Sequence, residues 1–292
     1  MKTNRSKQAV LVSVLLAVGV GVLSGRAGGE DQKAVQYSRL FAWWKLNEGK
    51  GLVAADASGN KLDGTLTTGV VAPPRKPKPG ETPVITPEEV VKSGPTWTND
   101  AGRVALSFDG FNDMVECPTH LENLTLPFSF TFWVKQGANS DGHQQNIFGN
   151  QASRKGEVGG LVMQDGGGEE GPGLYRFNYH GKNGGWYNPE WHPVLSPGKW
   201  LHLAVVCNGE RAFYYINGVQ KLTEQQINAE AHKAPKGAFV PNTNLTFRLG
   251  TGIAQGRFFR GMLSDFRIYR TALTPEEVQA VMKEGAVEPA GK

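Results

Sequence analysis

The sequence predicts an all-β fold in which two antiparallel sheets pack as a sandwich, with one short helix near the C-terminus. Two observations lead to this fold class. About ten to twelve short apolar runs with period-two alternation are separated by turns rich in Gly, Asn and Asp. The chain also has 38 glycines and 17 prolines while only 20% of its residues are charged, which suits a turn-rich protein better than a helical one.

The N-terminus has the features of a secretion signal. Lys2, Arg5 and Lys7 precede an apolar run over residues 9–23, and small residues follow it. This run is shorter than the ~20 apolar residues that span a membrane. We therefore expect residues 1–27 to be cleaved and the protein to reach the extracellular space, the cell surface or the periplasm. Membrane attachment is expected only if this signal stays uncleaved.

The positive charge of the chain lies in that same segment. Residues 1–27 carry four basic side chains and no acid, and the formal net charge of the whole chain is +4. The remainder is therefore neutral. Because phosphate binding needs clustered Lys and Arg, we expect no nucleic-acid partner.

The predicted organisation beyond the signal is a polar leader over residues 28–36, one domain over 37–286 and a tail over 287–292. The domain opens with an alternating strand over residues 40–47, and a turn rich in Asp, Asn and Gly follows. Residues 71–95 are rich in Pro and charge and have no periodicity. We interpret them as an exposed insertion, since the strand patterns on both sides need partners.

Further strands are predicted after the insertion, and residues 128–135 are the cleanest period-two segment. A loop over residues 181–193 is rich in aromatic side chains. The remaining strand predictions cover residues 104–108, 114–117, 147–149, 161–163, 175–179 and 245–249.

The most informative stretch is a hairpin over residues 198–220, in which Asn208-Gly209 separates two apolar runs. A two-residue turn at this dipeptide places Val205 opposite Ala212. Both faces of the hairpin are apolar, so we expect it to be a central pair of a larger sheet.

The pattern of the C-terminal part of the sequence predicts one strand followed by one helix. A second Asn-Gly pair at residues 217–218 ends the hairpin, and residues 262–269 alternate so that Met262 and Phe266 share a face. Thr274 then caps a helix with Pro and two Glu in its first turn, and Gly285 stops it.

Five ordered segments of the chain share the pattern of a known family. They are AWWKLNEGKGLVAADASGNKLDGTL (42–66), GPTWTNDAGRVALSFDGFNDMVECP (94–118), FSFTFWVK (128–135), GKWLHLAVVCNGERAFYYINGVQ (198–220) and FFRGMLSDFRIYRTALTPEEV (258–278). These segments resemble the laminin-G-like, concanavalin-A-like jelly-roll domains of exported bacterial proteins. The resemblance runs from about residue 41 to residue 285 and implies a jelly-roll sandwich. It leaves the function open, because this fold hosts lectins, adhesion modules, pentraxins and glycan-cleaving enzymes.

A catalytic role is not expected. Glucanases of this fold resemble one another in a Glu-x-Asp-x-x-Glu strand, and that spacing does not occur in this sequence. The sequence also lacks a Ser-centred nucleophile elbow and a His pair at metal spacing. The six histidines are scattered, and we expect His202 to pack within the hairpin.

Calcium is the one cofactor that the sequence suggests. Two clusters offer hard oxygen ligands, but the same residues cap tight turns, and calcium usually needs about six or more oxygens. We favour turn capping, because neither cluster alone offers that many side chains. A pentraxin-type site is disfavoured, because the loop over residues 250–257 has no carboxylate. The candidate ligands are Asp56, Asn60 and Asp63 in one cluster and Asp109, Asn112 and Asp113 in the other.

The aromatic loop is the candidate ligand site. Trp186, Tyr187, Trp191 and His192 form either a flat platform for sugar rings or a lid packed on the core, and the sequence does not decide between them. Five arginines also raise the idea of an anionic glycan site, although strand arginines are more often solvated. They are Arg103, Arg248, Arg257, Arg260 and Arg267.

The two cysteines have two interpretations. Export permits a disulfide between Cys117 and Cys207, but nothing in the sequence shows that they meet. Both residues also suit buried apolar positions.

We therefore expect an exported, non-catalytic binding module whose partner is an extracellular glycan or protein, with carbohydrate favoured. The alternatives are an adhesion or structural module that contacts protein, and a divergent polysaccharide-cleaving enzyme.

Overall fold

The computed structural model describes ten segments of the chain, and all statements below concern them. The predicted signal (1–27), leader (28–36) and tail (287–292) lie outside these residues, as does the insertion apart from its last three positions, so the predictions for them are not tested. Within the described residues, no helix has the length and apolar character needed to cross a membrane. The segments are 37–69, 93–137, 144–151, 159–166, 174–181, 186–187, 192–193, 197–221, 239–252 and 257–285.

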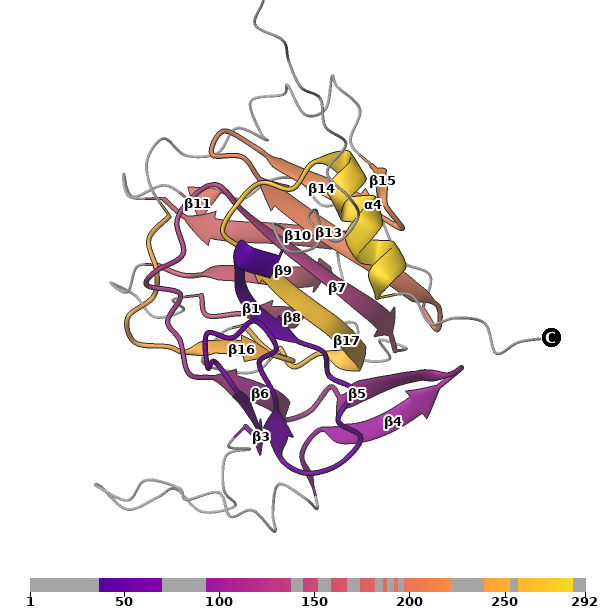
Figure 1. Ribbon diagram of the computed structural model, residues 1–292. Coiled ribbons are helices and arrows are strands. Elements are labelled where there is room, and N and C mark those ends of the chain that lie inside the picture. Colours follow the sequence, from indigo (N-terminus) through magenta and orange to yellow (C-terminus); the bar gives the residue numbers. More distant parts are fainter. Residues whose placement is uncertain are drawn as a thin grey trace, which may run out of the picture.

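Two antiparallel sheets form a sandwich, which confirms the predicted fold class (Figure 1). The eight-stranded sheet has the order β15-β14-β13-β7-β17-β5-β4, and β1 also pairs with β17. Its strands are β1 (Leu40–Trp44), β4 (Thr96–Asp100), β5 (Arg103–Asp109), β7 (Phe128–Gln136), β13 (Trp200–Cys207), β14 (Ala212–Ile216), β15 (Val219–Gln220) and β17 (Arg260–Tyr269).

The nine-stranded sheet has the order β11-β10-β9-β8-β16-β6-β3-β2, and β12 also pairs with β10. Its strands are β2 (Val53–Ala54), β3 (Gly64–Thr68), β6 (Asp113–Cys117), β8 (Gln145–Gly149), β9 (Leu161–Gly166), β10 (Leu174–His180), β11 (Trp186–Tyr187), β12 (His192–Pro193) and β16 (Phe247–Leu249).

Aromatic rings from both sheets fill the space between them. Phe130 of β7 stacks on Phe148 of β8 with 5.2 Å between ring centroids, and Phe148 meets Phe266 of β17 edge-on at 4.9 Å. All three side chains are fully buried, and each such burial contributes about 1.5–3 kcal/mol. Cys117 and Cys207 are buried in the same core on strands of different sheets, and both are free thiols.

The hairpin has the predicted faces but a different register. Val205 pairs with Tyr214 and Cys207 with Ala212, a shift of two positions from the predicted pairing of Val205 with Ala212. The cause is Asn208, whose side chain accepts hydrogen bonds from the backbone N–H groups of the two residues that close the turn, both at 2.9 Å. The turn is therefore longer than the Asn-Gly dipeptide alone.

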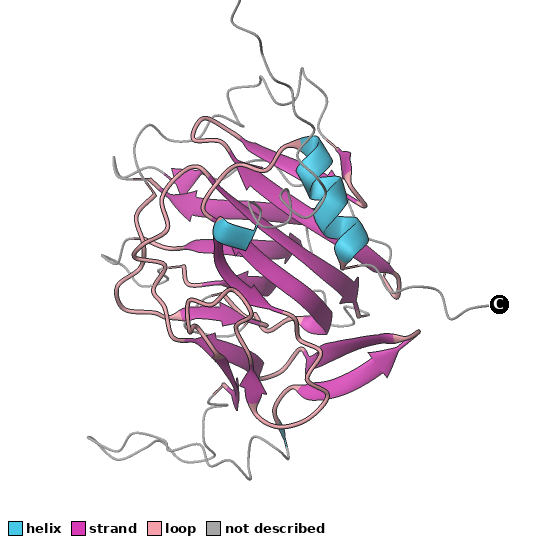
Figure 2. Cartoon of the chain, in the orientation of Figure 1, coloured by secondary structure: helices cyan, strands magenta, loops and turns pink. Residues whose placement is uncertain are grey.

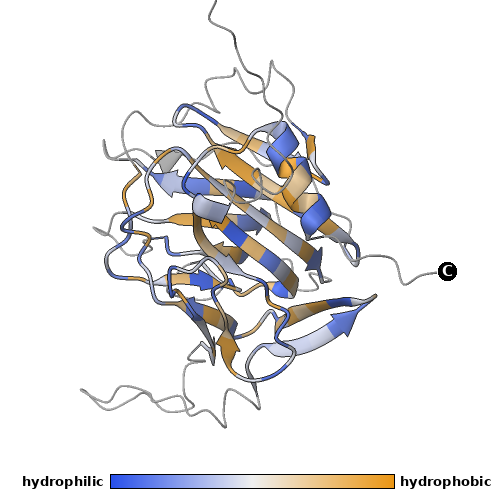
Figure 3. Ribbon diagram, viewed as in Figure 1, coloured by the Kyte–Doolittle hydropathy of each residue, from blue (hydrophilic) through white to orange (hydrophobic). Residues whose placement is uncertain are grey.

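The hairpin also lies nearer the edge of its sheet than predicted, since β14 is followed only by the short strand β15. Its second apolar face is instead covered by helix α4 (Pro275–Glu284), which crosses the outer surface of the eight-stranded sheet (Figure 2). Val206 and Tyr215 of the hairpin pack with Val278 and Val281 of this helix. In Figure 3 the strands beneath α4 are coloured largely as hydrophobic.

Helix α4 has the caps that the sequence predicts. The Thr274 hydroxyl accepts a hydrogen bond from the Glu277 N–H, and the Glu277 carboxylate accepts one from the Thr274 N–H. This reciprocal pair satisfies N–H groups that have no partner within the helix. Gly285 ends the helix as expected.

Strand β17 departs from the predicted alternation. Its pairing with β7 shifts between Ser264 and Arg267, and Asp265 has a positive φ of 51°. Such a bulge inserts one extra residue and turns the side chains beyond it to the other face. Leu263 and not Met262 therefore shares the core with Phe266, which corrects the sequence prediction.

Candidate functional site

The bulge lies where β17 changes its neighbour. One edge of β17 pairs with β7, while the other edge pairs with β5 over residues 260–263 and with β1 over residues 266–269. Between these two partners, the Asp265 N–H donates to the Lys45 carbonyl at 2.9 Å. β5 and β1 separate at this point, and a pocket of about 550 Å³ opens on the outer face of the sheet.

We name this hollow the junction pocket. Its walls come from the start of the described chain, the end of β1, the β4–β5 turn, the β17 bulge and the C-terminal end of α4. The lining residues are Tyr37, Trp43, Lys45, Asn47, Gly102, Arg103, Val104, Ser264, Asp265, Arg267, Glu284 and Gly285.

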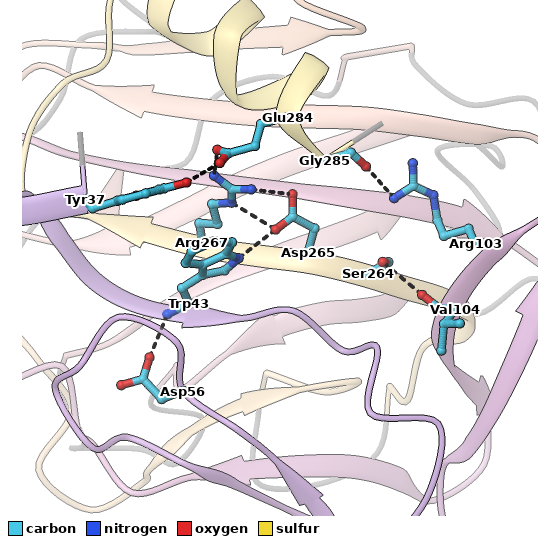
Figure 4. Close-up of polar contacts among 10 residues, drawn as sticks. All are labelled: Tyr37, Trp43, Asp56, Arg103, Val104, Ser264, Asp265, Arg267, Glu284 and Gly285. Carbon is cyan, nitrogen blue, oxygen red and sulfur yellow. Dashed lines mark hydrogen bonds and ion pairs between the residues drawn. The ribbon is translucent and has the colours of Figure 1, made fainter. Parts of the chain in front are cut away.

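Arg267 forms the floor of the junction pocket and is fully paired (Figure 4). Its Nε and Nη2 donate to the two oxygens of Asp265, both at 2.9 Å, and its Nη1 donates to Glu284 at 2.7 Å. Burial by itself lowers the pKa of this guanidinium, but the charge of Asp265 and hydrogen bonds to both acids raise it above its ordinary value. This network joins β17 to the end of α4.

Trp43 and Tyr37 form an aromatic wall beside this network. The Trp43 indole donates to Asp265 at 2.7 Å, and its ring stacks on Tyr37 with 5.5 Å between centroids. The Arg267 guanidinium carbon lies 4.3 Å from the Trp43 ring centroid. The Tyr37 hydroxyl donates to Glu284, and burial together with this bond raises the pKa of Tyr37 to about 12. These contacts hold the wall rigid.

Arg103 is held differently. The β4–β5 turn has positive φ angles at Ala101 and Gly102, which aim the following residue at the pocket. The Arg103 Nη1 donates to the Gly285 carbonyl at 2.8 Å, and its guanidinium carbon lies 4.1 Å from the Trp133 ring centroid. It is only 7% exposed, and burial lowers its pKa. Among the described residues it forms no ion pair.

Sequence reasoning missed this site because arginines on strands were expected to be exposed to solvent. Arg103 and Arg267 are instead buried, and the fold brings them to one pocket from distant parts of the chain. Of the other arginines, Arg248 pairs with Glu116 at 3.3 Å and Arg260 donates to a backbone carbonyl. No sequence signal marks a β-bulge that turns Asp265 outward.

The predicted aromatic platform is only partly described. The backbones of Trp186 and Tyr187 form β11 and that of His192 belongs to β12, and both strands pair with β10 at one end of the nine-stranded sheet. Trp191 and the side chains of the other three lie outside the described residues. The choice between platform and lid therefore stays a prediction.

The first cluster of predicted metal ligands caps a turn. The Asp56 carboxylate accepts hydrogen bonds from the N–H groups of Trp43 and Leu62, at 2.9 and 3.0 Å. Asp63 accepts from the Asp56 N–H at 2.7 Å, and the Asn60 amide donates to carbonyls of β1. These bonds fix the turn that follows β1 and thereby hold Trp43 in place.

The second cluster of predicted metal ligands also accepts hydrogen bonds from the backbone of its own turn. Asp109 accepts from the N–H groups of Phe111 and Asn112, and Asp113 accepts from the Asp109 N–H at 2.7 Å. Burial raises the pKa of Asp113 to about 7. Over the part of the chain that the structure describes, no group of three or more His, Cys, Asp or Glu side chains is placed to hold a metal ion.

The fold has relatives among solved structures. Domain 4 of AbnA, a GH43 extracellular arabinanase from Geobacillus stearothermophilus in complex with arabinotriose, matches with a TM-score of 0.55 and 21% identity, over 84% of this chain and 98% of that one. The binding domain of botulinum neurotoxin serotype D matches with a TM-score of 0.53 and 16% identity, over 86% and 53%. At these identities the likeness concerns the fold.

Sequence comparison gives two further findings. Human usherin is 31% identical over 83 residues, which are 28% of this chain and 2% of usherin, so the match spans a small fraction of that protein. Residues 109–279, more than half of the chain, match the family model of the concanavalin A-like lectin/glucanases superfamily. The chain therefore belongs to the concanavalin A-like lectin/glucanases superfamily.

Proposed function

We propose that this chain is an extracellular, non-catalytic module that binds carbohydrate in the junction pocket. The observation that carries the proposal is the pocket itself, a hollow of about 550 Å³ in which hydrogen bonds hold Arg103 and Arg267 in place. Its size lies within the ~300–1,000 Å³ of small-ligand sites.

The lining chemistry suits a sugar. Sugar hydroxyls both donate and accept hydrogen bonds, and the junction pocket offers the amide of Asn47, the ammonium of Lys45 and the guanidinium of Arg103. Arg103 is held by stacking and by its bond to Gly285, so it loses little freedom when a ligand binds. The rigid wall of Trp43 and Tyr37 adds apolar surface.

The acids of the pocket support binding over catalysis. Glycoside hydrolysis uses two carboxyl groups, one of which gives a proton to the leaving oxygen. Asp265 and Glu284 both accept hydrogen bonds from the Arg267 guanidinium, so these oxygens already have partners within the protein.

Two comparisons support the proposal. The AbnA domain, which shares this fold along almost its whole length, was solved with arabinotriose. The laminin-G-type family match and the usherin segment support an extracellular location.

A glycan array followed by calorimetric titration tests the proposed function. The purified chain is screened against neutral and acidic oligosaccharides, arabinotriose included, with and without calcium. We expect at least one oligosaccharide to bind and Asn47→Ala to weaken it, while the melting temperature stays unchanged because this side chain is exposed. Trp186→Ala and Trp191→Ala serve as comparison variants. If only these two variants lose affinity, the glycan binds at the aromatic loop and not in the junction pocket.

Two other outcomes contradict the proposal. Failure to bind any glycan favours the protein-contacting module. Release of new reducing ends from a plant or algal polysaccharide, lost in Asp265→Asn, shows a glycan-cleaving enzyme.

A further inference from the structure

The charges that line the junction pocket do not balance. Among the described residues that line it, three cations, Lys45, Arg103 and Arg267, face two acids, Asp265 and Glu284. Arg267 takes both acids, since three of its N–H groups bond to them. Arg103 and Lys45 are left without a carboxylate partner among the described residues.

Arg103 carries most of this imbalance. Among the described residues, its guanidinium donates to a neutral carbonyl and lies over the rings of Trp133 at 4.1 Å and Trp200 at 5.3 Å. A buried charge is costly unless it is paired, and side chains of this kind usually meet an opposite charge. Arg103 also lines a pocket that is open to solvent and wide enough for a ligand.

Lys45 adds a second positive group at the mouth of the pocket. It is exposed, and its ammonium lies 4.7 Å from the Trp43 ring centroid. An ammonium at this place attracts anions and strengthens the field that Arg103 sets up.

We propose that the junction pocket selects acidic sugars, with the ligand's carboxylate bound by Arg103 and Lys45. This inference rests on the proposed carbohydrate binding and names its ligand class. A planar guanidinium matches a planar carboxylate, and hydrogen bonds between charged partners are roughly twice as strong as neutral ones. Asn47 lines the same pocket, and its amide can both donate to and accept from a sugar hydroxyl.

The test compares ligands that differ only in the carboxylate. Titration calorimetry measures binding of oligogalacturonate and of the same oligosaccharide after reduction of its carboxylates to alcohols, and of sialyllactose against lactose. We expect the carboxylated member of at least one pair to bind about tenfold to hundredfold more tightly, and its affinity to fall as salt is added.

Three variants locate the effect. Lys45→Gln and Arg103→Gln should each remove most of the preference for the carboxylate, and Arg103→Lys should restore part of it. Lys221→Gln is the matched control, because this lysine is also exposed and does not line the pocket. Melting temperatures show whether Arg103→Gln is folded. If it is not, Lys45→Gln still tests the carboxylate preference, because an exposed side chain can be replaced without unfolding the protein.

The outcomes separate this inference from the proposed function. Equal binding of both members of each pair, or preference for a sulfated neutral sugar, overturns acidic-sugar selection while carbohydrate binding stands. A carboxylate preference that Lys45→Gln and Lys221→Gln reduce equally also overturns it, since the charge then acts from anywhere on the surface. Absence of binding to every glycan overturns both.

Discussion

At the scale of single residues, two arginines of the junction pocket differ in whether an acid pairs with them. Arg267 is 1% exposed and its guanidinium is paired with two carboxylates, so it joins the end of α4 to the sheet. Arg103 is 7% exposed and forms no ion pair with any described residue, although the charge of Asp265 acts on it from a distance. We infer that the first residue supports the fold and that the second is left for a ligand.

Replacing Arg267 is expected to destabilise the protein strongly. Arg267→Gln leaves Asp265 and Glu284 without their cation, and breaking a buried pair in this way costs about 3–5 kcal/mol. Denaturant unfolding measures the loss. The control is Arg248→Gln, because the Arg248–Glu116 pair is more exposed and should contribute less than about 1 kcal/mol. Similar losses in the two variants contradict the structural role of Arg267.

Asp113 should make stability depend on pH. Burial raises the pKa of this carboxyl from 3.8 to about 7. Between those values the folded protein keeps a proton that the unfolded chain has lost, so the free energy of unfolding falls as pH rises. The slope from this one group is about 1.4 kcal/mol per pH unit. Asp113→Asn should remove it, and parallel pH profiles for the two proteins measured by denaturation would refute the assignment.

At the scale of elements, the sequence predicted which strands form and which of their faces are buried, but it did not predict the pairing register of the strands. Alternation of apolar residues predicted β7 and the two sides of the hairpin, because a buried face must recur every second residue. The register depended on Asn208, whose side-chain bonds lengthened the turn. The bulge at Asp265 interrupts the period in β17. Ser264 and Asp265 are two consecutive polar residues before Phe266, but this stretch also fits a regular alternation that starts at Met262.

The end of helix α4 should tolerate no side chain at Gly285. A methyl group there would overlap the Asp265 carboxylate and press on the Trp133 indole. Asp265 cannot move aside freely, because Arg267 and Trp43 hold it. We expect Gly285→Ala to cost about 1–3 kcal/mol, as overpacking does. An unchanged unfolding midpoint would show that the helix end shifts without strain.

At the scale of the whole molecule, the sequence predicted the sandwich but not its pocket. The fold follows from many short local patterns, each of which is visible in sequence. The junction pocket combines Tyr37, Trp43, Arg103, Asp265 and Glu284, which are far apart along the chain and meet only because β17 changes partners. No local pattern in the sequence indicates that these residues meet.

The last prediction concerns the Pro-rich insertion, residues 71–95. The structure places β3 in the nine-stranded sheet before this segment and β4 in the eight-stranded sheet after it. Trypsin should cut the folded chain first between Arg75 and Lys92, because exposed polar segments without periodicity are preferred cleavage sites.

The two resulting fragments should stay together. The N-terminal fragment contributes β1, which pairs with β17, and β3, which pairs with β6, so each sheet holds part of it. Size-exclusion chromatography should therefore give one peak from a sample that shows two bands on a denaturing gel. Early cleavage within residues 181–193 and resistance of the insertion would contradict both interpretations. Separation of the fragments would show that these strand pairs are too weak to hold the sandwich closed.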